Sequence, residues 1–109
     1  MEKKIRQVIR SKYLDKDVAE LYEYGLETFG ELFANIFLEE LKHSINALSY
    51  QYHLHSECKY LETKTQIYRN IILGKYLIIY RIKAEKIEVL RALHGSQSPK
   101  KIKAIKKIK

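Results

Sequence analysis

In the first half of the chain, hydrophobic side chains recur at the spacing of a helix. Between residues 11 and 27 they fall three or four positions apart, and acidic side chains occupy the other side, which predicts an amphipathic helix. Ser11 stands just before this pattern, and its hydroxyl can accept a hydrogen bond from a free backbone N–H of the first turn. We therefore expect a helix capped by Ser11, with an acidic outer face.

A second helical pattern follows after a break at residues 28–31. Thr28 and Glu31 have the spacing of a capping box, in which the hydroxyl and the carboxylate each bind the other residue's backbone amide. The apolar stripe of this second helix consists of Phe33, Ala34, Phe37, Leu41, Ile45 and Leu48. Two helices joined by so short a break are expected to pack antiparallel, as a hairpin.

The hydrophobic pattern changes its period after residue 65. The segments 66–73, 75–83 and 86–94 are rich in Ile, Tyr, Val and Leu, and the separators are short enough only for hairpins, which predicts a three-stranded antiparallel meander. Residues 4–10 predict a first strand, and residues 49–65 predict a polar loop. The sequence thus predicts an α+β fold: an N-terminal strand, an antiparallel helix hairpin, the meander, and a C-terminal tail.

The middle segment of the meander carries apolar side chains on both of its faces. Such a strand belongs at the centre of a sheet, because both faces must be covered. We expect one face of the sheet to meet the helical hairpin. The other face is expected to line a groove that serves as the working surface.

Positive charge is concentrated in the tail. The chain has 109 residues, a size typical of one domain, and a formal charge of +8. Six lysines and no acid lie between Pro99 and Lys109, so removing those six charges leaves +2 for residues 1–98. We therefore divide the chain into a nearly neutral domain, 1–95, and a basic tail, 96–109, that suits phosphate or an acidic partner. Three isoleucines of the tail recur at helical spacing, so it is expected either to extend a target contact as a helix or to end in solvent.

Several features favour the cytoplasm. Cys58 has no second cysteine to form an internal disulfide with, which favours a reducing compartment. Residues 1–6 lack the apolar segment of a secretory signal. The longest apolar stretch, residues 71–80, is interrupted and too short to span a membrane. We expect a cytoplasmic protein with no membrane partner.

His53, His55 and Cys58 form the one cluster of potential zinc ligands. A structural zinc site needs a fourth ligand and a spacing that recurs in known sites, and this cluster has neither. The sequence also lacks H-E-x-x-H, G-x-S-x-G and glycine-rich phosphate-binding motifs. We therefore predict a surface loop, no metal and no cofactor.

Aromatic and cationic side chains follow one another along the predicted strands. They are Tyr68, Arg69, Tyr76, Tyr80, Arg81, Arg91 and His94, and Lys100 and Lys101 follow in the tail. Such groups can stack on bases, pair with phosphates or bind an acidic segment, so they are the predicted binding residues. The same pattern fits equally well if the tyrosines belong to the core and the arginines lie in solvent at strand ends.

A larger ordered set of residues belongs to a pattern that covers about residues 5–95. It comprises Ser11, Leu14, Asp17, Val18, Leu21, Tyr24, Phe29, Gly30, Ala34, Phe37, Leu41, Ile45, Leu48, Tyr68, Arg69, Gly74, Tyr76, Tyr80, Arg81, Ile87, Val89, Leu90, Arg91, Leu93, His94 and Gly95. With this order of elements, the chain resembles the ParE branch of the RelE/ParE toxins of bacterial type II toxin–antitoxin systems. It differs at residues 49–53, where ParE-like chains usually have a Pro-x-x-Gly loop.

The resemblance implies a toxin that inhibits DNA gyrase by binding, traps a cleaved complex and blocks replication. It also implies a ParD-like antitoxin whose disordered segment folds across the toxin, so the two chains form a hetero-oligomer. The binding residues named above, from Tyr68 to Lys101, would then contact the antitoxin or the target.

The same superfamily allows two other functions. In a RelE-like, ribosome-dependent endonuclease of mRNA, the set Arg69, Arg81, Arg91 and His94 would assist attack of a 2′-hydroxyl on the adjacent phosphate. However, Leu77 follows Tyr76 where the nuclease branch often has arginine, and a nearly neutral domain suits ribosomal RNA poorly. We therefore predict a binding inhibitor and not an enzyme. The third possibility is a decayed module member without toxicity.

Overall fold

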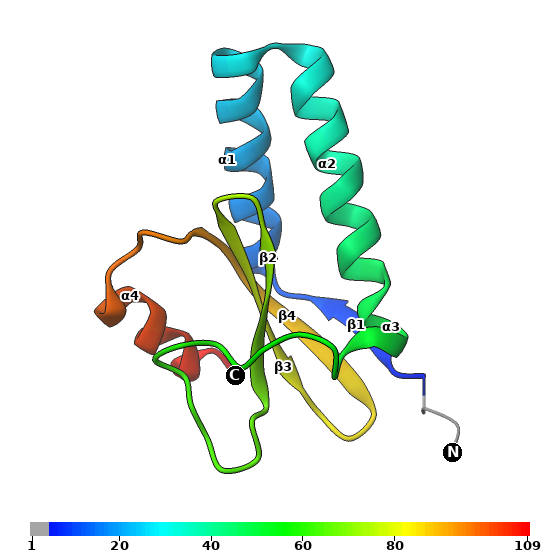
Figure 1. The fold of residues 1–109 in the computed structure, drawn as a ribbon, viewed down its shortest axis with the longest axis vertical. Coiled ribbons are helices and arrows are strands. Elements are labelled where there is room, and N and C mark those ends of the chain that lie inside the picture. The colour runs from blue at the N-terminus through cyan, green and yellow to red at the C-terminus, as the bar shows by residue number, and fades with distance from the viewer. Residues whose placement is uncertain (1–4) are drawn as a thin grey trace.

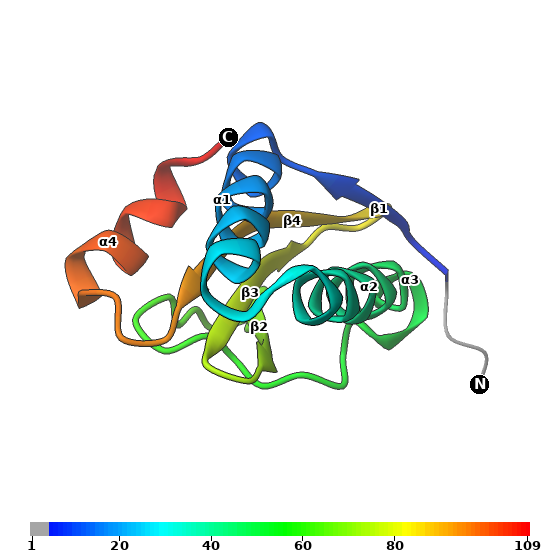
Figure 2. The same cartoon turned by 90° about the horizontal axis from the view of Figure 1, so that it is seen from above.

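The computed structural model describes residues 5–109 as a single sheet with helices on both faces (Figures 1 and 2). The elements are β1 (Gln7–Arg10), α1 (Lys12–Phe29), α2 (Glu31–Asn46), α3 (Leu48–Gln51), β2 (Tyr68–Leu73), β3 (Tyr76–Ile82), β4 (Lys86–His94), α4 (Pro99–Lys103) and the 3₁₀ helix η1 (Ala104–Lys107). The predicted fold class and order of elements are confirmed. Residue 4 of the predicted first strand lies outside the described residues.

The sheet has the strand order β1-β4-β3-β2. β2 pairs antiparallel with β3, and β3 pairs antiparallel with β4, so the predicted meander and its central strand are confirmed. β1 completes the sheet by pairing parallel with β4. The first strand therefore lies beside the last one, and α1 leaves the sheet from this junction.

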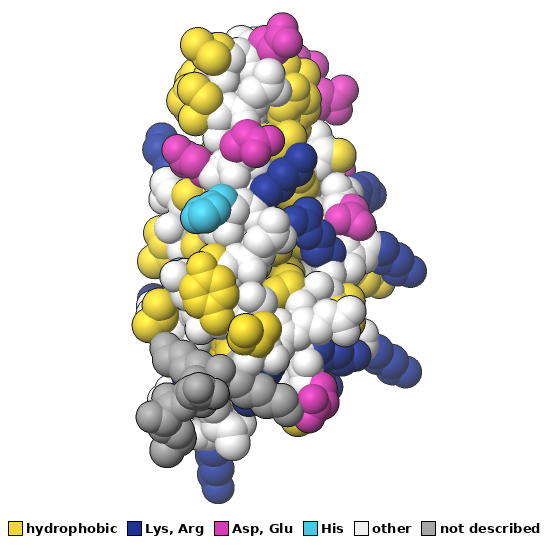
Figure 3. Space-filling model, turned by 90° about the vertical axis from the view of Figure 1, so that its right-hand side faces the viewer, with side chains coloured by type: hydrophobic (Ala, Val, Ile, Leu, Met, Phe, Trp, Pro, Cys, Tyr) yellow, Lys and Arg dark blue, Asp and Glu magenta, His cyan; other side chains and the backbone are white. Residues whose placement is uncertain are grey.

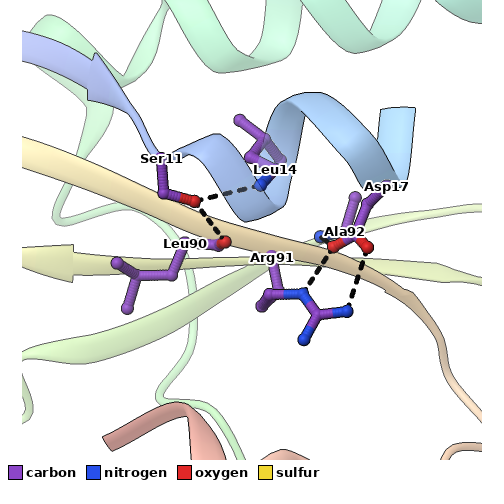
Figure 4. A network of polar contacts seen from close by, with 6 residues as sticks. All are labelled: Ser11, Leu14, Asp17, Leu90, Arg91 and Ala92. Atoms are coloured by element: carbon purple, nitrogen blue, oxygen red, sulfur yellow. Dashed lines mark hydrogen bonds and ion pairs between the residues drawn. The ribbon is translucent and has the colours of Figure 1, made fainter. Parts of the chain in front are cut away.

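The start of α1 is bound to β4 (Figure 4). The Ser11 hydroxyl accepts a hydrogen bond from the Leu14 N–H at 3.0 Å, which confirms its predicted role as N-cap, and donates to the Leu90 carbonyl at 2.7 Å. Leu90 is the extra residue of a β-bulge, because its neighbours Val89 and Arg91 pair with consecutive residues of β3. A bulge frees its carbonyl from the ladder, and here that carbonyl anchors the helix.

Gly30 joins α1 to α2. Its φ of 93° lies in a region that favours glycine, and its N–H donates to the Leu26 carbonyl at the end of α1. The same residue precedes α2, which has no side-chain cap. The predicted capping box of Thr28 and Glu31 is therefore wrong: Thr28 stays inside α1 because the chain reverses at the glycine. The predicted helical hairpin is confirmed (Figure 1).

The hairpin covers one face of the sheet. The core of this interface consists of Leu14, Leu41, Ile45, Leu48, Tyr52, Ile71, Ile78, Tyr80, Ile87, Val89 and Ala92. Three members of the predicted stripe, Leu41, Ile45 and Leu48, are almost completely buried here. Burial of each such side chain stabilises the fold by about 1.5–3 kcal/mol.

The opposite face of the sheet is filled, so the predicted groove there is wrong. Its core consists of Cys58, Leu61, Tyr68, Ile79, Leu90, Leu93, Ile102 and Ile105. The last two come from the tail, which folds back over the sheet on the side away from the hairpin (Figure 2). Arg81 donates a hydrogen bond to the Ile108 carbonyl at 2.8 Å and so holds the end of the tail. The tail is α-helical over Pro99–Lys103 and packs on the sheet, so it does not simply end in solvent.

The predicted loop, residues 49–65, contains more structure than its polar sequence indicates. α3 continues beyond α2 as far as Gln51, past the predicted end of the helix near residue 48. Tyr52, Cys58 and Leu61 then bury their side chains in the two cores. The loop therefore connects the two faces of the sheet as a packed segment.

Candidate protein-binding site

Half of the hairpin projects beyond the sheet (Figure 1). It exposes large hydrophobic side chains, some of them on the face that Figure 3 shows. They are Tyr24, Phe29, Leu32, Phe33 and Ile36, which we call the hairpin-tip patch. Leu32 and Phe29 expose 76% and 59% of their surface. A group of exposed apolar side chains on one part of the surface marks a candidate site of interaction with another molecule.

The aromatic rings of the hairpin-tip patch support one another. The ring centroid of Phe29 lies 4.7 Å from that of Phe33 and 6.4 Å from that of Tyr24, the latter in an edge-on arrangement. Such pairs add about 0.5–1.5 kcal/mol beyond the area they bury, so they hold the rings in place. The patch is therefore a preorganised surface.

A cavity of about 650 Å³ opens between the hairpin and the turn that joins β2 to β3. Its lining residues are Leu21, Tyr24, Gly25, Phe29, Phe33, Ala34, Phe37, Glu40, Leu73, Gly74, Lys75, Tyr76 and His94. Because Tyr24, Phe29 and Phe33 belong to both, the cavity and the hairpin-tip patch form one continuous surface. A pocket walled by aromatic rings is the kind of feature that anchors a side chain of a protein partner.

Tyr76 and His94 are the two predicted binding residues at this cavity. The Tyr76 ring packs 5.5 Å from Phe37 and, edge-on, 5.5 Å from His94. The Nδ1 atom of His94 accepts a hydrogen bond from the Ser96 N–H at 3.1 Å and lies 2.7 Å from the Ser96 hydroxyl. Both side chains are half-buried, so each presents one edge to a ligand in the cavity.

Three other predicted binding residues, Tyr68, Tyr80 and Arg81, are buried. The Tyr80 hydroxyl donates to the Tyr52 carbonyl at 2.7 Å, and burial raises the pKa of the Tyr80 phenol. Arg81 donates to the Glu88 carboxylate at 2.8 Å and to the Tyr68 hydroxyl at 3.3 Å. Burial lowers the pKa of Arg81, but these hydrogen bonds outweigh it and raise the pKa overall. These side chains therefore stabilise the core, as the second interpretation of the pattern allowed for the tyrosines.

Arg69 and Arg91 are closer to the surface but already have partners. Arg69 donates to the backbone carbonyls of Gln66, His53 and His55, at 3.0–3.1 Å. Arg91 forms a two-pronged pair with Asp17 at 2.6 and 2.9 Å, and this hydrogen bonding raises its pKa (Figure 4). Each arginine ties one segment of the fold to another.

The four residues of the nuclease alternative do not line a common site. His94 lines the cavity beside the hairpin, Arg91 lines a different cavity, and Arg69 and Arg81 line neither. General acid–base catalysis at a phosphate requires the cation and the proton-transfer group to face the same reacting atoms. The described arrangement does not provide that geometry.

Lys100 and Lys101, the predicted binding residues of the tail, are exposed on α4. Lys101 lines a second cavity of about 560 Å³ between the start of α1 and the tail. We call this cavity the tail cleft, and its lining residues are Lys12, Tyr13, Arg91, Lys101, Ala104, Ile105, Lys107, Ile108 and Lys109. Of the predicted binding residues, Tyr76 and His94 therefore line the hairpin cavity, and Arg91 and Lys101 line the tail cleft.

Residues 5–109 contain no group of three or more metal-ligating side chains. Cys58 of the predicted loop is buried, and burial, together with Glu62 and Glu57, raises the pKa of its thiol to about 11. Burial lowers the pKa of His55. Cys58 therefore packs as a protonated thiol beneath the loop, while His53 is exposed.

Sequence reasoning missed most of the hairpin-tip patch. Phe33 was assigned to the buried stripe of the second helix, and Leu32 and Ile36 were assigned no role. A signal was present, because apolar residues at positions 29, 32, 33 and 36 fall beside the stripe that continues at 34, 41 and 45. When a helix carries apolar residues beyond the stripe that packs on its own domain, the additional residues favour contact with another surface.

The fold and this surface define a small α+β protein with an exposed apolar face at the tip of its helical hairpin. Comparison with known families then identifies the chain: it belongs to the family described as "ParE toxin of type II toxin-antitoxin system, parDE", whose model matches residues 8–99. Among curated protein sequences, none matches this chain.

A solved structure supports the fold. The chain is similar to one from "Chromosomal ParDE TA system from P. aeruginosa", with a TM-score of 0.68 and 13% sequence identity. The match covers 83% of this chain and 96% of that chain. No helix within residues 5–109 is long and apolar enough to cross a membrane.

Proposed function

We propose that this chain is an active toxin that inhibits DNA gyrase by binding it, and that a cognate ParD-like antitoxin neutralises it in the cytoplasm. Membership of the ParE toxin family supports the toxin role. The observation that carries the mode of neutralisation is the hairpin-tip patch with its adjoining cavity. In this proposal, an antitoxin segment that is disordered alone folds onto that surface and forms a hetero-oligomer.

The physical case for this docking surface is its hydrophobicity. A segment that folds on binding must bury enough apolar area to offset its ordering, and the patch offers rings that are already fixed in place. Tyr76 and His94 line the floor of the same surface, where they would contact the bound segment. Arg69, Tyr68, Tyr80 and Arg81 would act indirectly, by holding the sheet beneath it.

A pair of matched variants tests the docking surface. Leu32→Glu places a charge in the patch, whereas Leu54→Glu places one on a leucine of similar exposure, 63%, outside it. We expect Leu32→Glu to weaken antitoxin binding about 30-fold, the effect of losing a central apolar anchor. Leu54→Glu should bind like the parent chain in the same calorimetric titration. Equal losses, or no loss, in the two variants would contradict the assignment.

The inhibition of gyrase is tested separately. The purified chain should reduce supercoiling of a relaxed plasmid by gyrase, and should leave mRNA intact on translating ribosomes. The scattered positions of Arg69, Arg81, Arg91 and His94 favour inhibition by binding over cleavage. Cleavage of mRNA without inhibition of gyrase would reverse this choice, and the absence of both activities would identify a non-toxic member.

A further inference from the structure

The tail cleft is lined by positive charges that lie outside the surface proposed to bind the antitoxin. Four exposed lysines line it: Lys12 at the start of α1, and Lys101, Lys107 and Lys109 in the tail. None of its lining residues is acidic. Figure 3 shows acidic side chains near the hairpin tip, and α1 also carries Asp15 and Asp17 in its first turns, close in sequence to Lys12 and Tyr13 of the cleft. The lining of the cleft itself is therefore positively charged.

The Asp17 carboxylate is paired with Arg91, which lines this cleft. Asp17 accepts from Arg91 through both oxygens and also from the Ala92 N–H at 3.0 Å (Figure 4). It therefore neutralises Arg91 and no lysine. None of the four lysines forms an ion pair with an acidic residue of the described chain. Like charges held around one cavity repel each other, so an anionic ligand would relieve this repulsion.

The tail cleft exposes few large hydrophobic side chains, which favours nucleic acid over protein as its ligand. Protein partners gain most of their affinity from buried apolar anchors. Of the lining residues, only Tyr13 is a large hydrophobic side chain that is strongly exposed, and the Lys12 ammonium lies 5.5 Å from its ring centroid. Ile105 is already used in the core beneath. Nucleic acids, in contrast, are held mainly by cations that contact their phosphates.

We propose that the tail cleft binds the phosphate backbone of duplex DNA. The choice of DNA rests on the proposed gyrase target, because gyrase holds duplex DNA while it acts; the phosphate contact itself rests on the four lysines. The toxin would then bind the gyrase–DNA complex more tightly than gyrase alone. Its apolar hairpin surface would remain free for the antitoxin.

Two variants of equal charge test the cleft. The cleft variant combines Lys12→Gln, Lys101→Gln, Lys107→Gln and Lys109→Gln. The control variant combines Lys16→Gln, Lys42→Gln, Lys64→Gln and Lys83→Gln, all exposed and outside the cleft. Each set removes four charges from the formal +8, so nonspecific attraction falls equally. Circular dichroism checks that both variants fold.

Fluorescence anisotropy with a short labelled DNA duplex measures the effect. We expect the cleft variant to bind at least about tenfold more weakly. The slope of log K against log salt concentration should be flatter by about 3.6, since each of the four phosphate contacts contributes about 0.9. The control variant should bind within about twofold of the parent chain. Equal weakening in both variants would overturn the proposal, as would full competition by polyglutamate of equal charge, which would identify an acidic peptide as the ligand.

A second measurement separates this proposal from the proposed function. The parent chain and the cleft variant are each titrated against gyrase with and without linear DNA. If the parent chain inhibits gyrase but DNA does not strengthen its binding, the cleft proposal fails while the gyrase target stands. If the parent chain does not inhibit gyrase but binds DNA through the four lysines, the cleft stands and the gyrase target fails.

Discussion

The hairpin end and the tail side of this protein both combine apolar and charged residues, but in opposite arrangements. At the hairpin end, Phe29 and Leu32 are exposed and the surrounding charges are acidic. On the tail side, Ile102 and Ile105 are buried and the exposed charges are lysines. The first arrangement offers apolar anchors to a protein, and the second offers cations to an anion. Two partners can therefore be accommodated without competition for one surface.

The comparison also concerns stability. The tail completes the second core, whereas the projecting half of the hairpin contributes little beyond its own helices. Substitutions on the tail side should therefore affect folding, and substitutions at the hairpin tip should affect binding. The predictions below test this difference.

The largest effect is expected from deleting residues 99–109. The deletion removes two buried isoleucines and exposes Ile79 and Leu90 beneath them, which should lower the free energy of unfolding by about 3–6 kcal/mol. Urea denaturation measures this loss. A triple variant, Lys100→Gln with Lys103→Gln and Lys106→Gln, keeps the isoleucines and should stay within about 0.5 kcal/mol of the parent chain. A deletion that costs nothing would show that the tail lies outside the core.

Asp17→Ala should have the next largest effect. It leaves the partly buried Arg91 guanidinium and the Ala92 N–H without their acceptor, at a cost of about 2–3 kcal/mol. Asp15→Ala, an exposed neighbour on the same helix, should cost less than about 1 kcal/mol. Thermal denaturation of both variants checks the difference. Equal melting temperatures would mean that the pair does not fasten α1 to the sheet.

Gly30→Ala tests the turn of the hairpin. A side chain at φ 93° is strained, so we expect a loss of about 1–2 kcal/mol. Thr28→Ala should cost less than about 0.5 kcal/mol, because Thr28 makes no capping contact. If Thr28 and Glu31 formed a capping box, Thr28→Ala would itself lower the free energy of unfolding by about 1 kcal/mol. Chemical denaturation of the two variants distinguishes these structures.

The smallest effect is a dependence on pH. Burial raises the pKa of Glu88, but the hydrogen bond from Arg81 outweighs it and holds the pKa below its ordinary value of 4.5. The stability from this pair is therefore fully present above the unfolded-state pKa, and is lost as pH falls through the lower folded-state pKa. Glu88→Gln should lose less stability than the parent chain between neutral pH and about pH 3. The urea midpoint of each chain is measured as a function of pH. An equal decrease in the two chains as pH falls would contradict this account.

Local patterns were sufficient to predict most elements of the fold. The segment 86–94 coincides with β4, and the other two strands of the meander begin and end within two residues of their predicted bounds. Ser11 was identified because capping depends on a single neighbouring turn. These features depend on residues that are close together in the sequence. The spacing of apolar residues and the identity of single residues are therefore sufficient to predict them.

Features that depend on distant contacts could not be predicted. Nothing in the lysine-rich tail specifies that Ile102 joins the core cluster that contains Ile79, so this face of the sheet was expected to be open. The binding residues were chosen by side-chain type, yet Arg81 is buried against Glu88 and Arg69 binds loop carbonyls. Tyr76 and His94 reach the cavity because the β2–β3 turn lies against the hairpin, a tertiary arrangement that a period cannot specify.

Hydrogen–deuterium exchange of the chain with and without its cognate antitoxin tests the central claim most directly. The account predicts new protection of the facing ends of α1 and α2 and of the β2–β3 turn, with exchange in α4 and η1 unchanged. Protection confined to α4 and η1, with the hairpin exchanging as it does in the free chain, would contradict it.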